Sequence, residues 1–292
     1  MHMDAAPYPS VDYLAIGHVC RDVVSGGYVT GGSAAYSTAV AHSLGCRAGI
    51  VTSAAPGERF EGVSPDIPVH RIDAPATTLF ENIYTANGRE QIIHSVAGEL
   101  VAGHIPPLWS RAPMVHLGPI ANEVDPSIIH LFSNSMVCVV PQGWMRRWDE
   151  KGRVYQVAWE GAASVLPLAA VTILSVEDVP NASMIEDYAE LARLLVVTDG
   201  ANGCTVYWDG QVRTFPVPSV NAVDATGAGD VFAAAYLVRL LQTGGDAWDA
   251  AEFANHIAAC SVTRRGLTEK THAIRRLLAE RMQQRAGGES TT

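Results

Sequence analysis

Short apolar runs alternate with longer helical patterns along the first two thirds of the chain. The apolar runs are rich in Val, Ile and Leu, are bounded by turn residues and lack strict alternation of apolar and polar positions. Strands of this kind are buried on both faces, which is typical of a mostly parallel sheet covered by helices. The pattern therefore predicts a doubly wound α/β fold. We expect strands at 11–16, 48–53, 114–117, 136–140, 171–174 and 194–198, and helices at 33–44, 126–133 and 183–193.

The last third of the chain has a mostly helical pattern. Helices are expected at residues 228–241, 247–264 and 270–284. The segment 285–292 is polar and contains glycine, so we expect it to be a disordered tail. Because the chain has no internal repeat and no low-complexity linker, the sequence predicts a single domain over residues 1–284.

One segment departs from the alternation of strands and helices. Residues 78–85 and 90–96 favour strands, and Asn87-Gly88 between them is a strong hairpin signal. We expect a small hairpin at about residues 77–97, either as a flap or lid over a site or as an ordinary edge hairpin. Only eight residues separate Asp22 from Gly31, which we interpret as too few for a second lid hairpin.

Charge and composition exclude several classes of partner. Twenty basic residues against thirty acidic ones give a net charge of −10, which disfavours binding to nucleic acid or to an anionic membrane. The two lysines, Lys151 and Lys270, do not follow glycine, so a Walker-A loop is excluded. Five scattered cysteines without a Cys-x-x-Cys pair indicate free thiols. With no visible signal peptide and no apolar run long enough to span a bilayer, we expect a cytoplasmic protein.

The segment 224–230 carries the clearest chemistry. Gly227 and Gly229 allow a tight turn that exposes successive amides at the start of an apolar helix. Such a helix start binds anions, because its N–H groups are unpaired and its dipole favours negative charge. Asp230 lies in the first turn of this helix, either as a capping residue or as a carboxylate that accepts a proton from an attacking hydroxyl.

Segment 224–230 and the helix after it resemble the C-terminal signature of the ribokinase-like (PfkB) family of sugar and nucleoside kinases. Three more segments resemble that family in order: the Gly-Gly pair in 30–39, the nucleotide segment 197–203 and the adenine-side helix at 253–255. The resemblance extends from about Val11 to Thr268. It implies an ATP-dependent kinase that uses Mg²⁺ and phosphorylates a hydroxyl of a small sugar or polyol, as a monomer or a homodimer.

The resemblance also implies roles for individual residues. Asp230 would be the catalytic base. Asp224 could help to hold a monovalent cation such as K⁺ behind the anion hole, as in some relatives. The implied groups are the anion-hole amides of Gly227, Ala228 and Gly229, the substrate-binding residues Asp22, Gly31, Gly32, Tyr36, Gln142 and Arg146, and the ATP-binding residues Thr198, Gly200, Gly203 and Asn255.

The chain departs from the family pattern at the metal and substrate positions. The usual Asn-x-x-Glu motif reads Glu177 to Pro180, so the metal ligands are unknown; Glu177 or Asp178 could substitute through water. Tyr36 replaces the usual Asn after the Gly-Gly pair. Arg146 could clamp a phosphate or could be an ordinary surface arginine.

The compact plan of the chain is similar to a branch of the family that includes inositol kinases. A polyol such as myo-inositol is therefore the leading substrate, with Glu81 and Asn82 on the hairpin as candidate hydroxyl partners. Two alternatives stay open: a catalytically silent sugar- or nucleoside-binding protein on the same fold, and a nucleoside or vitamin kinase of the same family.

Overall fold

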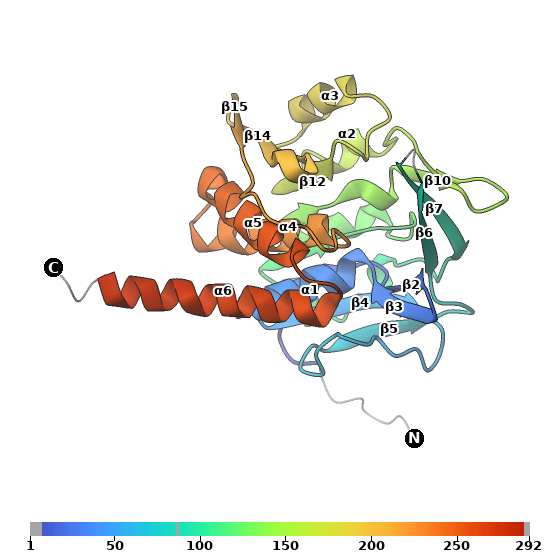
Figure 1. Cartoon of the computed structure of the whole chain (residues 1–292). Helices are drawn as coiled ribbons and strands as arrows, with labels where there is room; N and C mark the ends of the chain where they lie inside the picture. The colour runs from blue at the N-terminus through green and yellow to red at the C-terminus, as the bar shows by residue number, and fades with distance from the viewer. Residues whose placement is uncertain (1–7, 86–87, 289–292) are drawn as a thin grey trace.

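A nine-stranded sheet forms the centre of the molecule (Figure 1). The computed structural model describes residues 8–85 and 88–288. In spatial order the strands are β15 (Gln211–Phe215), β14 (Cys204–Trp208), β13 (Leu194–Thr198), β12 (Val171–Ser175), β9 (Met136–Val139), β8 (Met114–Leu117), β1 (Tyr13–Ile16), β4 (Ala48–Ala54) and β5 (Val69–Asp73). Neighbouring strands from β13 to β5 pair in parallel, and β14 and β15 pair antiparallel at one edge.

Helices cover both faces of this sheet, which confirms the predicted doubly wound fold. Alternate residues of β1 face opposite cores: Tyr13 and Ala15 pack against the helices of one face, whereas Leu14 and Ile16 pack on the other. The first face carries α1 (Ser33–Ser43), α4 (Ala228–Gln242), α5 (Ala247–Val262) and the start of α6 (Leu267–Gly288), and the second carries α2 (Ala162–Val165), α3 (Ser183–Leu191) and the 3₁₀ segment η3 (Pro126–Phe132). All six predicted strands are present, with ends that differ by at most two residues.

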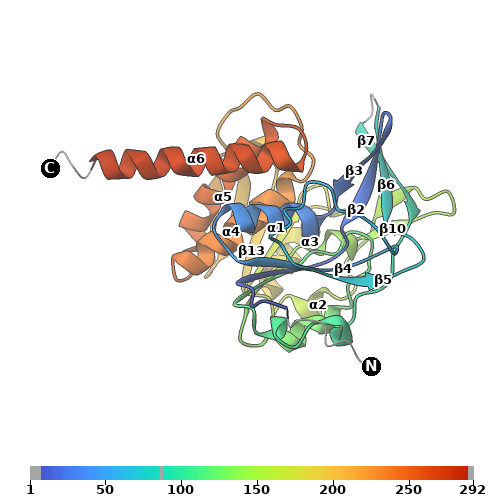
Figure 2. The same cartoon turned by 90° about the horizontal axis from the view of Figure 1, so that it is seen from below.

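The C-terminal helix is longer than the sequence predicts. Helix α6 runs to Gly288 and projects beyond the α/β body in both views (Figures 1 and 2). Residues 285–288 of the expected tail are therefore helical, and residues 289–292 lie outside the described part of the chain.

Two hairpins, rather than one, form the lid. The expected hairpin is present as β6 (Leu79–Thr85) and β7 (Gly88–Ser95), and Asn87 of its turn lies outside the described residues. The prediction that segment 22–31 is too short for a hairpin is wrong: β2 (Cys20–Val24) and β3 (Gly27–Gly31) pair antiparallel. Because Gly26 adopts a φ of 91°, a turn of residues 25–26 suffices to reverse the chain. The sheet order is β3-β2-β6-β7.

A small ribbon connects the lid to the main sheet. Strands β10 (Arg146–Trp148) and β11 (Val154–Gln156) pair antiparallel, and Arg153 bridges to Ile92 of β7. Short 3₁₀ turns complete the loops: η1 (Ala102–His104), η2 (Trp109–Arg111), η4 (Pro141–Gly143) and η5 (Gly200–Asn202). The ribbon brings Arg146 beneath the lid, where its guanidinium lies 5.9 Å from the centre of the Phe80 ring.

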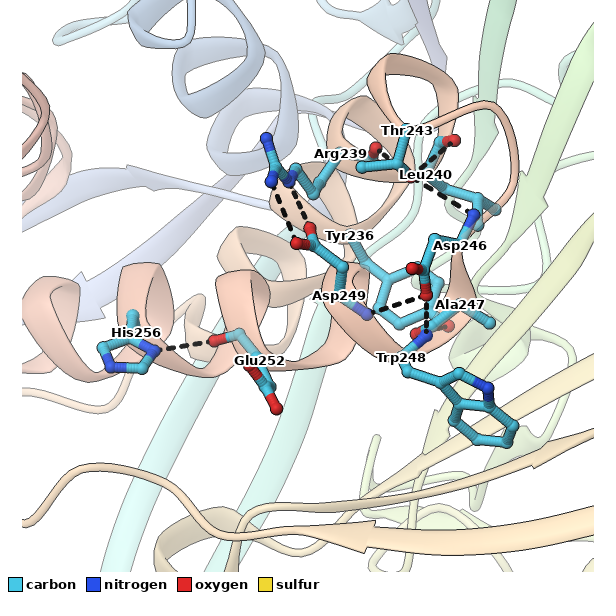
Figure 3. Close-up of polar contacts among 10 residues, drawn as sticks. All are labelled: Tyr236, Arg239, Leu240, Thr243, Asp246, Ala247, Trp248, Asp249, Glu252 and His256. Atoms are coloured by element: carbon cyan, nitrogen blue, oxygen red, sulfur yellow. Dashed lines mark hydrogen bonds and ion pairs between the residues drawn. The ribbon is translucent and has the colours of Figure 1, made fainter. Parts of the chain in front are cut away.

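The connection between α4 and α5 is fixed by polar contacts (Figure 3). The carboxylate of Asp246 accepts hydrogen bonds from the N–H groups of Trp248 at 3.0 Å and Asp249 at 3.1 Å, and so caps α5. Tyr236 of α4 donates to the carbonyl of Ala247 at 2.9 Å, and Arg239 pairs with Asp249. Since Gly227 is the N-cap of α4 and α5 carries Asn255, this connection helps to position two predicted parts of the site.

We expect Asp246→Ala to lower the free energy of unfolding by about 1 kcal/mol, because two amides at the start of α5 lose their acceptor. For a chain of this size that corresponds to a fall in Tm of about 2–4 °C in calorimetry. Asp246→Asn is the matched control, since Asn also caps helices. An Asn variant as unstable as the Ala variant would contradict the capping role.

Candidate active site

A cavity of about 460 Å³ lies between the lid and the carboxyl ends of the parallel strands. Strand-end loops and helix N-termini converge at this edge in open α/β sheets, which makes it the usual ligand site. Most of the predicted site residues are part of its wall, whereas Gly31, Glu81 and Asp224 are not. The wall includes Asp22, Gly32, Tyr36, Gln142, Arg146, Thr198, Gly200, Gly203, Gly227, Ala228, Gly229, Asp230 and Asn255.

The turn before α4 has the geometry of an anion site. Gly227 has a φ of 72°, and a Cβ built on it would lie 2.5 Å from the ring of Tyr36. Tyr36 therefore packs directly on the glycine, and only glycine fits there. Of the three expected anion-hole amides, that of Ala228 is already paired, because its N–H closes the turn by donating to the Ala225 carbonyl at 3.0 Å. A Cβ on Gly229 would meet no atom within 4 Å, so this position is open to a ligand.

Asp230 is a carboxylate whose charged form is disfavoured. Burial raises the pKa of Asp230 to about 6, against the opposing effect of a hydrogen bond with Ser33. The positive charge of Arg146 also lowers that pKa, while the negative charges of Asp178 and Asp22 raise it. A carboxylate whose pKa lies near neutrality is suited to accept a proton from a hydroxyl.

A buried polar chain supports Asp230 from behind, and sequence reasoning missed it. Ser33 lies 3.1 Å from Nε2 of His116, and the hydroxyl of Tyr13 lies 2.8 Å from its Nδ1. Burial lowers the pKa of His116 to about 3, so the ring is neutral and one nitrogen accepts while the other donates. This series of hydrogen bonds fixes the hydroxyl of Ser33, which contacts Asp230. His116 occupies an apolar strand without any motif, so no sequence signal identifies it.

The Gly-Gly pair makes room for Asp22 and for the backbone of the lid. A Cβ on Gly31 would lie 2.1 Å from a carboxylate oxygen of Asp22, which explains why Gly31 itself lies outside the cavity wall. Gly32 has a φ of 93°, and its Cβ would lie 2.4 Å from the carbonyl oxygen of His18. The pair thus places the Asp22 carboxylate in the cavity at the start of α1.

The lid strand β6 presents alternate residues to the cavity. Phe80 and Asn82 line the wall, and Asn82 accepts a hydrogen bond from Gln91 at 3.0 Å. Glu81 lies between them and pairs with His94 at 2.9 Å on the other face, as strand alternation requires. Of the two candidate hydroxyl partners, Asn82 is therefore the one at the cavity.

A second hydrogen-bonded carboxylate lies at the end of β12. One oxygen of Asp178 accepts from Gln142 and the other accepts from the Ser175 N–H, each at 2.9 Å. Glu177 is exposed and lines the cavity. No group of three His, Cys, Asp or Glu side chains that could enclose a metal ion is found within residues 8–85 and 88–288. Mg²⁺ needs only one or two carboxylates when phosphates and waters complete its shell, so Glu177 fits this use.

The far end of the cavity is shaped by α5 and the edge strands. The side-chain amide of Asn255 donates to the carbonyl of Phe215 at 3.0 Å and so ties α5 to β15. Gly203 has a φ of 95°, and its Cβ would lie 2.0 Å from the same carbonyl oxygen. A Cβ on Gly200 would meet no atom within 4 Å. Asn255 thus shapes the wall, and Ala258, which the motifs do not include, lies one turn further along it.

Glu123 is a structural residue near the site that has no sequence signal. It is buried, and its carboxylate accepts hydrogen bonds from the N–H groups of His18 at 2.9 Å and Ala121 at 2.7 Å. The ring of His18 in turn contacts Thr78 at 2.7 Å. These contacts hold the base of the lid against the sheet.

Comparison with known proteins identifies relatives of this chain. Residues 170–274 match the family described as pfkB family carbohydrate kinase. The chain is 32% identical to an inositol 3-kinase of Zea mays over 176 residues, covering 57% of this chain and 45% of that protein. It is 28% identical to a cytidine kinase of Thermococcus kodakarensis over 245 residues, covering 78% and 87%. The chain thus spans less than half of the length of the inositol kinase that it matches.

A solved structure resembles the fold over most of both chains. It is a pyrophosphate-dependent kinase in the ribokinase family, complexed with a pyrophosphate analogue and myo-inositol. The TM-score is 0.76 at 21% identity, covering 89% of this chain and 99% of that one. The resemblance to the ribokinase-like family and the fold class are confirmed. No helix in the described part of the chain is long and apolar enough to cross a membrane.

The raised pKa of Asp230 predicts a stability change that depends on pH. Because the folded-state pKa, about 6, lies above the ordinary value of 3.8, the carboxyl favours folding when protonated, and this contribution is lost as the pH rises through about 6. Asp230→Asn should therefore raise the free energy of unfolding at pH 8 by about 1–2 kcal/mol and change it little at pH 4.

Urea unfolding at both pH values measures this difference. Asp187→Asn is the control, since it removes an exposed carboxylate from α3. An equal effect of Asp230→Asn at pH 4 and pH 8 would show that its pKa is not raised.

Proposed function

We propose that the chain transfers the γ-phosphoryl group of ATP to a hydroxyl of a small polyol, because its fold is ribokinase-like and residues 170–274 match the pfkB family of carbohydrate kinases. The observation that carries this proposal is the position of Asp230. Its carboxylate, with a pKa of about 6, lies beside the N-terminal amides of α4 in the cavity that also contains Asp22.

In this proposal Asp230 accepts the proton of the attacking hydroxyl. Phosphoryl transfer demands alignment, charge stabilisation and an acceptor for that proton. The amides of Gly227 and Gly229 stabilise the transferring group, since amides at a helix start are directed towards negative charge. Arg146, whose charge acts on Asp230, adds a positive charge on the lid side.

Mg²⁺ would reduce the negative charge of the donor phosphates when bound. Glu177 would hold it together with phosphate oxygens, because both oxygens of Asp178 already accept hydrogen bonds. Thr198, Gly200, Gly203 and the neighbourhood of Asn255 would accept the nucleoside part of ATP. The support for a nucleotide is the extension of the cavity past the anion site to Ala258 on α5.

A polyol is the proposed acceptor because the lid side of the cavity is rich in groups that bind hydroxyls. Asp22 contributes a carboxylate, and Asn82 and Gln91 contribute amides. Polar groups fixed in this way discriminate strongly between substrates that have a hydroxyl and those that lack it. An inositol, with a hydroxyl on every ring carbon, matches such a wall.

The proposal is tested by turnover of ATP with a panel of pentoses, hexoses, inositols, nucleosides and pyridoxal. We expect an inositol to have the highest kcat/KM, rising with pH through about 6 because Asp230 must be deprotonated. Asp230→Asn should lower kcat by about 10²–10⁴-fold, the usual effect of losing a general base.

Two outcomes would overturn parts of this proposal. An Asp230→Asn variant that keeps more than about a tenth of the wild-type kcat would exclude Asp230 as the base. Turnover with no member of the panel, together with heat-stabilisation by a sugar, would favour the silent binder.

The nucleotide end of the cavity has its own test. Ala258→Leu should raise KM for ATP by about 10-fold or more, because overfilling a packed site costs about 1–3 kcal/mol. KM for the acceptor should not change. His256→Leu, on the exposed face of α5 (Figure 3), is the matched control. If Ala258→Leu leaves KM for ATP unchanged, or if pyrophosphate replaces ATP as donor with equal kcat/KM, the nucleoside site is not at α5.

A further inference from the structure

Lys270 is a charged residue buried in the core. Its side chain is 1% exposed, although it lies in the first turn of α6. Taking an ammonium group out of water is costly unless oxygen atoms replace its hydration shell. Lys270 has no part in the proposed proton transfer or in the binding of either substrate, so another role must explain why it is buried.

Three oxygen atoms of one loop surround the ammonium group. Nζ donates to the backbone carbonyls of Asp224 at 2.5 Å and Thr226 at 3.0 Å, and it lies 3.6 Å from a carboxylate oxygen of Asp224. This loop leads directly into the turn at Gly227. The positive charge therefore lies on the side of the anion site that faces away from the cavity.

The loop is also tied to the start of α6 by Asp224 itself. One carboxylate oxygen accepts from the Thr226 N–H at 2.9 Å, and the other accepts from the Gly266 N–H at 3.3 Å. Burial opposes the charged form of Asp224, but these hydrogen bonds and the charge of Lys270 lower its pKa below the ordinary value. The carboxylate is therefore ionised, and the ion pair with Lys270 is a fixed part of the loop.

The contact with Thr226 acts on the anion site through one peptide group. The carbonyl of Thr226 and the N–H of Gly227 belong to the same planar trans peptide, so they point in opposite directions. When the carbonyl points at Nζ of Lys270, the N–H points away from it, towards the anion site. A cation on the carbonyl also polarises the peptide and strengthens its N–H as a donor.

We propose that Lys270 is a positioning residue that serves as a covalently attached monovalent cation for the anion site. It orients the Gly227 amide towards the transferring phosphoryl group, and it makes an exchangeable cation such as K⁺ unnecessary at Asp224, where the resemblance to the family implies one in some relatives. This role rests on the proposed kinase function, which it deepens.

The first test removes the charge while keeping the volume. Lys270→Met should lower kcat by about 10–10²-fold. This decrease is no larger than the one caused by removing an oxyanion-hole donor, because the Gly227 amide remains in place. KM for the acceptor should stay within about threefold, because the groups proposed to bind it, Asp22, Asn82 and Gln91, lie on the lid side of the cavity. A folded Lys270→Met variant with wild-type kcat would overturn the proposal.

The second test replaces the attached cation by a free one. Lys270→Ala leaves space beside the oxygens of Asp224 and Thr226, so NH₄⁺ or K⁺ should restore activity and raise Tm, whereas choline at the same ionic strength should not. Lys270→Met is the matched control, because its side chain fills the space. A purely structural role would give the same loss in both variants without rescue, and this result would overturn the proposal.

Two measurements separate this proposal from the kinase function and from a failure of the variants to fold. Wild-type protein should bind inorganic phosphate equally well in K⁺, NH₄⁺, Na⁺ and choline chlorides at equal ionic strength. The binding is measured by the rise in Tm that phosphate causes. Phosphate should protect Lys270→Met less than wild type. A wild-type requirement for K⁺, or equal protection of both proteins, would overturn the role of Lys270 even if no acceptor is ever phosphorylated.

Discussion

The left-handed turn at Gly227 is the constraint on which the site depends. It starts a helix that is buried along most of its length, while the exposed Gly229 in the first turn leaves the helix N-terminus open to the cavity. Tyr36 packs against the glycine from one side and the loop of Asp224 holds it from the other. The position of the proposed anion site is thus set by packing as much as by hydrogen bonds. The position of Asp230 follows from it, because Asp230 lies in the first turn of the same helix.

Much of this arrangement could be predicted because it is local in sequence. The parallel strands are continuous apolar runs, and the turn at Gly227 requires glycine where the chain has it. The cavity at the carboxyl ends of the strands follows from the topology alone. Residues such as Asp22 and Asp230 were identifiable because each lies in a short motif, and both line the cavity that the structure contains.

The remaining features depend on contacts between distant segments, which no short pattern encodes. The β2–β3 hairpin forms because Gly26 permits a very short turn, a backbone property that the spacing of Asp22 and Gly31 does not reveal. His116 is 83 residues away in sequence from its partner Ser33, and Lys270 is 46 residues away from its partner Asp224. Their residue types alone would suggest a core histidine and a surface lysine.

The balance of charge explains why these distant residues are needed. Burial raises the pKa of Asp230 to about 6, and the negative charges of Asp178 and Asp22 act in the same direction. A cavity of that charge would repel phosphate unless positive groups were fixed around it. Arg146 supplies one from the lid side, and in our proposal Lys270 supplies the other from the core, where its side chain is 1% exposed. In our proposal the Asp230 base and the Gly227 amide lie within one helical turn of each other. Lys270 offsets the negative charge that gathers there, because its ammonium group contacts the other side of the Thr226–Gly227 peptide.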